Sequence, residues 1–270
     1  MQNYENQYLD KSLIHKENSW EYYFEQPDSG KEYTIQSVYN SKHVILSNKT
    51  DVSHEYYTIN DDDIYNRENR ERLLYARKLF QEYIQINDKT RKYLDNERGV
   101  FLGGGRRVLG VLCRGTDYIN KKPPGHLVQP GPDEVIKKAE DILEKYSCSY
   151  IYLATEDQDI YDLFEARFGK ILLANGQKRF RKTDFKNIQY ISEIEPEGAG
   201  GGNYLLGLEY LSSINILSKC TCFIGGRTCG TVGVYLMSGG FEYDYTWDLG
   251  RYPSEKITLK YLLNKFFKYT

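Results

Sequence analysis

The chain has 270 residues, of which 40% are hydrophobic and 27% are charged, and this composition suits a globular protein of one or two domains. Its net charge of −2 excludes the basic balance of a nucleic-acid-binding protein, so any anion site must be local. Neither a signal-peptide pattern nor an apolar run of about 18 residues occurs, so we expect a cytoplasmic protein. Five cysteines without zinc-site spacing are expected to be reduced thiols.

A long helical pattern begins at Asp61-Asp62-Asp63 and extends to about Tyr93. Acidic residues favour a helix start, and apolar residues then recur at spacings of three and four. The loop Gly103-Gly104-Gly105 predicts a domain boundary. We therefore expect a small N-terminal region with a long linker helix over residues 1–100, and a second domain over residues 101–270.

The second domain shows strand patterns that alternate with helical patterns. Such alternation predicts an α/β fold with a parallel sheet and right-handed crossovers. The predicted strands cover residues 107–113, 149–154, 170–173 and 221–224, and the predicted helices cover residues 132–146, 157–168 and 203–219, with a last helix that ends near residue 237.

In open parallel sheets, ligands bind beyond the carboxyl ends of the strands. The segment Cys113-Arg114-Gly115-Thr116-Asp117 follows the first predicted strand. The Arg114 guanidinium can fork onto two phosphate oxygens, and Gly115 lets the backbone approach a ligand closely. Asp117 would orient Arg114 or accept a proton. The alternative is a structural Arg114–Asp117 pair that closes a turn.

Two further segments follow predicted strands. Thr155 and Asp157 can cap the next helix or bind a ribose or a base. The Gly-rich turn from Gly225 to Gly233 opens a helix, whose backbone N–H groups attract an anion, although such glycines also serve tight packing. Together with Arg114, this turn predicts a diphosphate site. Its candidate ligand-binding residues are Arg227, Thr228, Cys229, Gly230 and Thr231.

Two features outside these segments are weaker candidates. His126 can act as an acid or a base near neutral pH, although a lone loop histidine is more often solvated. The basic run Lys178–Lys182 would contact an anionic lipid-linked acceptor or the inner face of a membrane, or it is a solvated surface. No suitable pair of aspartates follows a strand, so no metal ion and no other cofactor are expected.

Three segments resemble the donor-binding domain of the GT-B fucosyltransferases, which include the α-1,6-fucosyltransferases and the protein O-fucosyltransferases. These segments are VLGVLCRGTDY (108–118), YLATED (152–157) and residues 217–237. The sequence is also similar to small bacterial relatives found with surface-polysaccharide synthesis. The resemblance implies a GT-B-like fold, with a Rossmann-like parallel sheet in the C-terminal domain and a reduced or incomplete N-terminal α/β domain.

The same resemblance implies roles for single residues. Arg114 matches an arginine that holds the β-phosphate of GDP, and Thr116 and Asp117 follow it as in the family. Leu112 and Gly115 replace a histidine and a second arginine of the family pattern.

An acidic residue that contacts guanine in the family has two possible counterparts in this chain. The strict alignment puts Ser213 at that position, and Glu209 lies one turn earlier.

The resemblance implies metal-independent, inverting transfer of fucose or a related sugar. The donor would be a nucleoside-diphosphate sugar, with GDP favoured, and the acceptor a glycan or a lipid-linked glycan. Asp117 and His126 are the candidate catalytic bases. The alternative is a catalytically silent nucleotide-binding or scaffold protein of the same fold.

Overall fold

The computed structural model describes residues 8, 18–26, 61–115, 122, 124–185 and 202–253. In chain order, the elements of these segments are the 3-10 helix η2 (Ser19–Tyr22), α2 (Asp61–Tyr65), α3 (Glu71–Tyr83), α4 (Asp88–Leu102), β1 (Val108–Leu112), α6 (Pro132–Lys145), β2 (Tyr150–Ala154), α7 (Gln158–Phe168), η3 (Gly169–Ile171), β3 (Leu172–Leu173), η4 (Lys182–Phe185), α8 (Gly202–Leu217), β4 (Cys222–Gly226), α9 (Cys229–Met237) and β5 (Tyr243–Trp247).

The strands of the described segments form one sheet in the order β3-β2-β1-β4-β5, and every neighbouring pair is parallel. The chain enters at β1, moves outward through β2 and β3, and then returns to β4 on the other side of β1. This is the strand order of a Rossmann-like sheet, and it creates a topological switch point between β1 and β4. The predicted α/β fold with a parallel sheet is confirmed.

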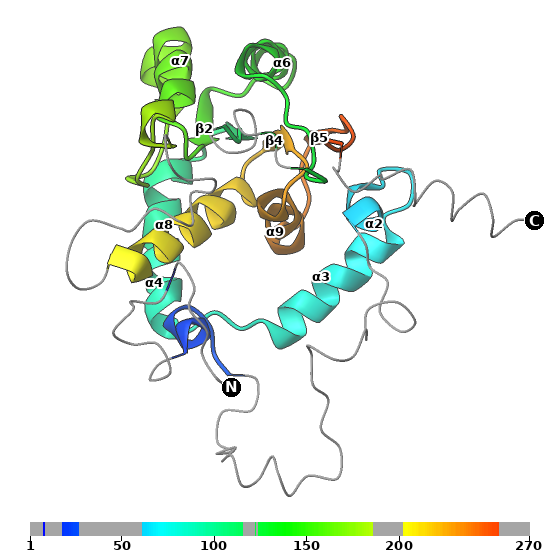
Figure 1. Cartoon of the computed structure of the whole chain (residues 1–270). Coiled ribbons are helices and arrows are strands. Elements are labelled where there is room, and N and C mark those ends of the chain that lie inside the picture. The colour runs from blue at the N-terminus through cyan, green and yellow to red at the C-terminus, as the bar shows by residue number, and fades with distance from the viewer. Residues whose placement is uncertain are drawn as a thin grey trace, which may run out of the picture.

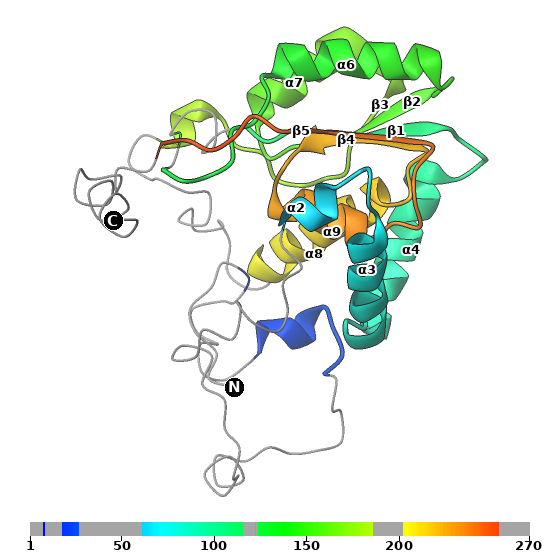
Figure 2. The ribbon, with the colours of Figure 1, turned by 90° about the vertical axis from the view of Figure 1, so that its right-hand side faces the viewer.

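Helices cover both faces of the sheet (Figure 2). Leu109 and Val111 of β1 point into a core shared with α6 and α7. Val108 and Leu112 point into the opposite core, which includes buried residues of α8 and α9. Successive strand side chains point to opposite faces, so a continuous apolar strand must be covered on both sides.

The helices before β1 extend the second of these two layers. α3 packs against α9, and α4 packs against α8 (Figures 1 and 2). Leu73 and Ala76 of α3 are buried in the same core as α8 and α9. Gly104 and Gly105 form the turn between α4 and β1 with φ of 73° and 70°, a backbone conformation that favours glycine. The division near residue 100 stays a prediction.

The single long helix predicted from Asp61 to about Tyr93 is wrong, because this stretch forms α2, α3 and the start of α4. The Asn66 side chain accepts hydrogen bonds from the N–H groups of Glu68 and Asn69 and so makes the turn after α2. The Asn87 side chain accepts from Thr90 N and caps α4. Because all three helices contribute apolar side chains to one core, the apolar spacing continues across both breaks.

Four smaller findings complete the fold. The third strand is shorter than predicted, because residues 169–171 form η3 and leave only Leu172–Leu173 for β3. β5, at the opposite edge of the sheet, is an element that the sequence patterns did not predict. All five cysteines are free. Among the helices of the described ranges, none is both long enough and apolar enough to cross a membrane.

Candidate functional site

The carboxyl ends of β1, β2 and β4 meet at one edge of the sheet. The parallel register sets Leu112 beside Ala154 on one side and beside Gly225 on the other. The residues that follow these three positions are therefore brought together at the switch point. Tyr210 of α8 packs beside them and lines a recess with Arg114 and Glu156. We call Arg114, Glu156, Tyr210 and residues 228–231 the switch-point site.

Arg114 is held at this edge by a carboxylate that follows the neighbouring strand β2. Its Nε lies 3.4 Å from Glu156 Oε1, and about a fifth of its side chain (21%) is exposed. The buried Glu156 side chain also accepts a hydrogen bond of 3.0 Å from Gly115 N. Glu156 thus fixes both the guanidinium and the backbone next to it.

Asp157 and Thr155 are buried and serve the local fold. Asp157 Oδ1 accepts from Asp159 N and Ile160 N at 2.9 and 3.0 Å and so caps α7. Thr155 Oγ1 accepts from Asp157 N at 3.2 Å. Of the two functions weighed for these residues, the helix cap has direct geometric support.

The N-terminus of α9 forms the opposite wall of the site. Thr228 Oγ1 accepts from Thr231 N at 3.2 Å and caps the helix. The hydroxyl of the fully buried Thr231 donates to Gly226 O, so this donor is used within the fold. The N–H groups of Cys229 and Gly230 lie in the first turn of α9, where a helix has no internal acceptors. No described residue accepts a hydrogen bond from them.

Tyr210 of α8 lies between these two walls. It lines a recess together with Arg114 and Glu156, and a Cβ atom on Gly230 would lie 2.7 Å from its hydroxyl oxygen. Burial raises the pKa of Tyr210 to about 12, although the nearby charge of Arg114 acts in the opposite direction. Its hydroxyl therefore stays neutral near pH 7 and can both donate and accept a hydrogen bond.

The recess beside Arg114 is narrow. Gln177 and Ser213 also line it, and it encloses only about 10 Å³, which is close to the least space that one water needs. Ser213 thus shares this recess with Arg114. Glu209 lies one turn away, next to the loop after β3, and burial raises the pKa of its carboxyl.

Arg227 and His126 lie towards the β5 side of the edge. The Arg227 guanidinium pairs with Asp248 at 2.8 Å and stands 4.8 Å above the centre of the Tyr65 ring. Residues 125–128 pair with residues 250–252 after β5, where His126 O accepts from Tyr252 N at 2.9 Å. The roles of Arg227 and His126 at a ligand site stay predictions.

The basic run is largely engaged by the fold. Arg181 pairs with Asp159 at 2.7 Å and with Asp162 at 2.9 Å. Arg179 stands 4.4 Å above the centre of the Tyr161 ring, and burial lowers the pKa of its guanidinium. Thr116 and Asp117 lie outside the described residues, which include the first motif only as far as Gly115.

Sequence reasoning did not select Glu156 and Tyr210. Glu156 had a usable signal, because it is an acidic residue directly after the strand that neighbours β1. Tyr210 had none, since it comes from the middle of α8 and reaches the site only through packing.

In the described part of the chain, no group of three or more His, Cys, Asp or Glu side chains could hold a metal ion, and the expectation of metal independence stays a prediction.

Comparison with known proteins gives distant likenesses. No protein-family model and no curated protein sequence matches the chain. The structure of fucosyltransferase NodZ from Bradyrhizobium matches with a TM-score of 0.37 and 12% identity, over 59% of this chain and 44% of that one. NodZ α-1,6-fucosyltransferase soaked with GDP-fucose matches with a TM-score of 0.39 and 16% identity, over 66% and 56%. POFUT1 in complex with GDP-fucose matches with a TM-score of 0.37 and 8% identity, over 67% and 51%.

These structures are fucosyltransferases, the class of enzyme that the sequence motifs resemble. The chain spans about half the length of the structures it matches.

Proposed function

We propose that the chain is a glycosyltransferase that takes fucose or a related sugar from a nucleoside-diphosphate sugar, with GDP favoured. The acceptor would be a glycan or a lipid-linked glycan. The observation that carries this proposal is the meeting of Arg114 and the N-terminus of α9 at the switch point. A guanidinium can fork onto phosphate oxygens, and a helix N-terminus attracts anions. Together they suit a diphosphate.

The transfer needs charge stabilisation on the leaving group. The acceptor hydroxyl oxygen attacks the anomeric carbon, and the bond between that carbon and the β-phosphate oxygen breaks. The nucleoside diphosphate leaves with the bonding electron pair, and the hydroxyl proton passes to a base. Attack on the face opposite the leaving group inverts the configuration. Arg114, the neutral Tyr210 hydroxyl and the N–H groups of Cys229 and Gly230 would stabilise the departing charge without a metal ion.

Glu156 would act as a positioning residue for this step. Its ion pair with Arg114 Nε at 3.4 Å and its hydrogen bond from Gly115 N hold the guanidinium before the donor arrives. Preorganised charge of this kind needs no reorganisation during the reaction. Asp117 and His126 remain the candidate bases.

The rival function is a silent nucleotide-binding or scaffold protein of the same fold. A specific feature favours it, because Gly115 stands where the family pattern has a second arginine. The turn after β1 would therefore supply only one guanidinium to the diphosphate. A silent protein would bind the nucleotide and leave the donor intact.

A thermal-shift panel with GDP, UDP, CDP and ADP tests the proposal, since a ligand that binds only the folded state raises the unfolding temperature. We expect stabilisation by GDP above the other nucleotides, unchanged by EDTA and lost in Arg114→Ala. Arg98→Ala is the matched control, because Arg98 lies in the C-terminal half of α4, which leads to the amino end of β1, and pairs only with Asp95 at 3.0 Å among the described residues.

The outcomes separate the two functions. No shift with any nucleotide would overturn the donor site. A shift without release of sugar from GDP-fucose, in the presence or absence of a mixture of glycan acceptors, would favour the silent protein. A shift that disappears with EDTA would overturn metal independence.

We also propose a cytoplasmic role in bacterial surface-polysaccharide synthesis, with peripheral membrane contact through Lys178–Lys182. Because Arg179 and Arg181 are engaged by Tyr161 and by acidic residues of α7, this contact would depend mainly on the lysines. Sedimentation with vesicles that contain anionic lipid tests it, and a protein that stays in the supernatant at low salt would count against it.

A further inference from the structure

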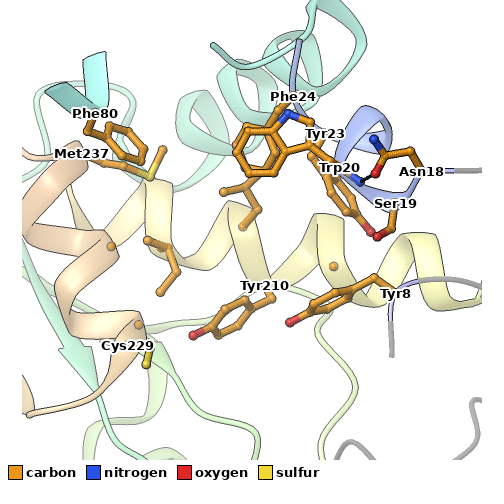
Figure 3. Close-up of a pocket in the computed structure, with 15 residues that line it drawn as sticks. Tyr8, Asn18, Ser19, Trp20, Tyr23, Phe24, Phe80, Tyr210, Cys229 and Met237 are labelled. Atoms are coloured by element: carbon orange, nitrogen blue, oxygen red, sulfur yellow. Dashed lines mark hydrogen bonds between the residues drawn. The ribbon is translucent and has the colours of Figure 1, made fainter. Parts of the chain in front are cut away.

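A second cavity lies on the side of α8 and α9 that faces away from the sheet. It has a volume of about 430 Å³ and is bounded by α3, α8, α9 and the segment around η2 (Figure 3). This volume falls in the range of small-molecule sites, roughly 300–1,000 Å³. No lining residue is charged, and the wall contains six aromatic rings, those of Tyr8, Trp20, Tyr23, Phe24, Phe80 and Tyr210.

The polar groups of the wall near η2 are mostly used by the protein itself. The Tyr23 hydroxyl donates to Tyr204 O at 2.9 Å. Trp20 Nε1 donates to Glu25 O at 3.1 Å, and the Asn18 side chain accepts from Trp20 N. A ligand with many hydroxyl groups would leave them without partners in this cavity, which costs free energy. The cavity therefore favours an apolar group over a bare sugar.

One side of the cavity adjoins the switch-point site. Tyr210 and Ile214 line both this cavity and the recess beside Arg114. Figure 3 shows the hydroxyls of Tyr8 and Tyr210 along the side near Cys229, whereas Phe80 and Met237 lie at the opposite side. An amphiphilic molecule would thus direct its polar end towards the N-terminus of α9.

We propose that this cavity binds the apolar part of the acceptor, an alkyl or aryl group attached to the hydroxyl-bearing end. The inference rests on the proposed function and adds the chemical class of the acceptor. The hydroxyl-bearing end would lie at Cys229 and Gly230, next to the anion-binding end of α9.

Cys229 supplies a direct readout of this binding. It lines the cavity and is exposed, whereas the other four cysteines are buried, so iodoacetamide should modify Cys229 selectively in the folded protein. We expect octyl β-D-glucoside, below its micelle concentration, to slow this reaction about tenfold at ten times its Kd. Phenyl β-D-glucoside tests an aryl group in the same position, and glucose alone should give no protection.

Wall variants test where the protecting molecule binds. Leu211→Gln adds a polar group to the half-buried cavity wall and should abolish protection by octyl β-D-glucoside. Leu205→Gln is the matched control, because Leu205 is on the same helix, is 51% exposed and does not line the cavity. Met237→Gln, on α9, is a second wall variant that guards against a folding defect in the first.

The outcomes distinguish this inference from the proposed function. Absence of protection by both glycosides, or equal protection in the wall variants and in Leu205→Gln, would overturn the cavity assignment even if GDP stabilises the protein. Protection by octyl or phenyl glucoside without stabilisation by any nucleotide would overturn the acceptor role and the donor site together. Protection combined with GDP stabilisation would support both.

Discussion

Gly115 has no room for a side chain. A Cβ atom at this position would lie 2.3 Å from Asp157 Oδ2, and the same aspartate caps α7 through its other oxygen. Gly115 N also donates to Glu156. The turn after β1, which contains Arg114, is therefore packed against the turn after β2.

Gly115→Ala should lower the free energy of unfolding by about 2–3 kcal/mol, because the methyl group displaces the capping carboxylate of Asp157. Urea unfolding followed by circular dichroism measures this change. Gly99→Ala is the control, since a Cβ there meets nothing within 4 Å and alanine in the exposed part of α4 should stabilise by about 0.5–1 kcal/mol. Equal effects of the two substitutions would contradict the packing argument.

At the scale of elements, the N-terminus of α9 is fixed from two directions. The Tyr65 hydroxyl at the end of α2 donates to Thr228 O at 3.0 Å. The Gln129 side chain donates to Arg227 O at 3.0 Å. The helix start is thus attached to the end of α2 and to the loop that contains Gln129, which keeps its first N–H groups at the switch point.

Thr228→Ala should cost about 1 kcal/mol of stability through loss of the helix cap, and it should also weaken GDP binding, since the first turn of α9 would fray. Thr228→Ser keeps the capping oxygen and should restore both properties. Calorimetric titration with GDP and urea unfolding measure the two effects separately. If the serine variant behaves like the alanine variant, the capping oxygen is not what orders this turn.

The sequence predicted the elements that have long or continuous apolar patterns. β1, β2 and β4 are buried on both faces, so their apolar runs are unambiguous. β5 has the sequence YDYTW and is half-buried over most of its length, so no apolar run marks it. Caps such as Asn87 are single residues that a periodicity does not detect.

The candidate site was predictable only in part. The rule that parallel strands end at one edge predicts that Arg114 and the turn after β4 lie together. The pairing of Arg114 with Glu156 and the position of Tyr210 depend on side-chain packing between elements, which spacing along the chain does not encode.

At the scale of the whole molecule, Asp244 of β5 links the edge of the sheet to the helices before β1. Its carboxylate accepts from Arg70 at 3.0 and 3.2 Å and from the Tyr235 hydroxyl at 2.6 Å. Arg70 directly precedes α3, and Tyr235 belongs to α9. One carboxylate thus joins three elements.

Asp244→Ala should lower the free energy of unfolding by about 2–4 kcal/mol, because a buried hydroxyl and a guanidinium lose their acceptor. Hydrogen exchange should speed up first in α3, which this contact anchors. Glu242→Ala is the control: Glu242 pairs with Arg107 in an exposed position, and such pairs contribute little. A small effect of Asp244→Ala on both stability and exchange would show that apolar packing alone holds α3.

The central position of β1 has a consequence for how the protein folds. Leu109 pairs with Ile151 of β2, 42 residues later, but with Cys222 of β4 only after 113 residues. Closing the longer loop costs more entropy, and non-local pairing slows folding. The unit of β1, α6 and β2 can therefore form while the rest of the chain is still being synthesised, because synthesis proceeds from the N-terminus. The switch point appears only when β4 joins, so the edge that brings Arg114 and the N-terminus of α9 together is assembled after β1, α6 and β2 have formed.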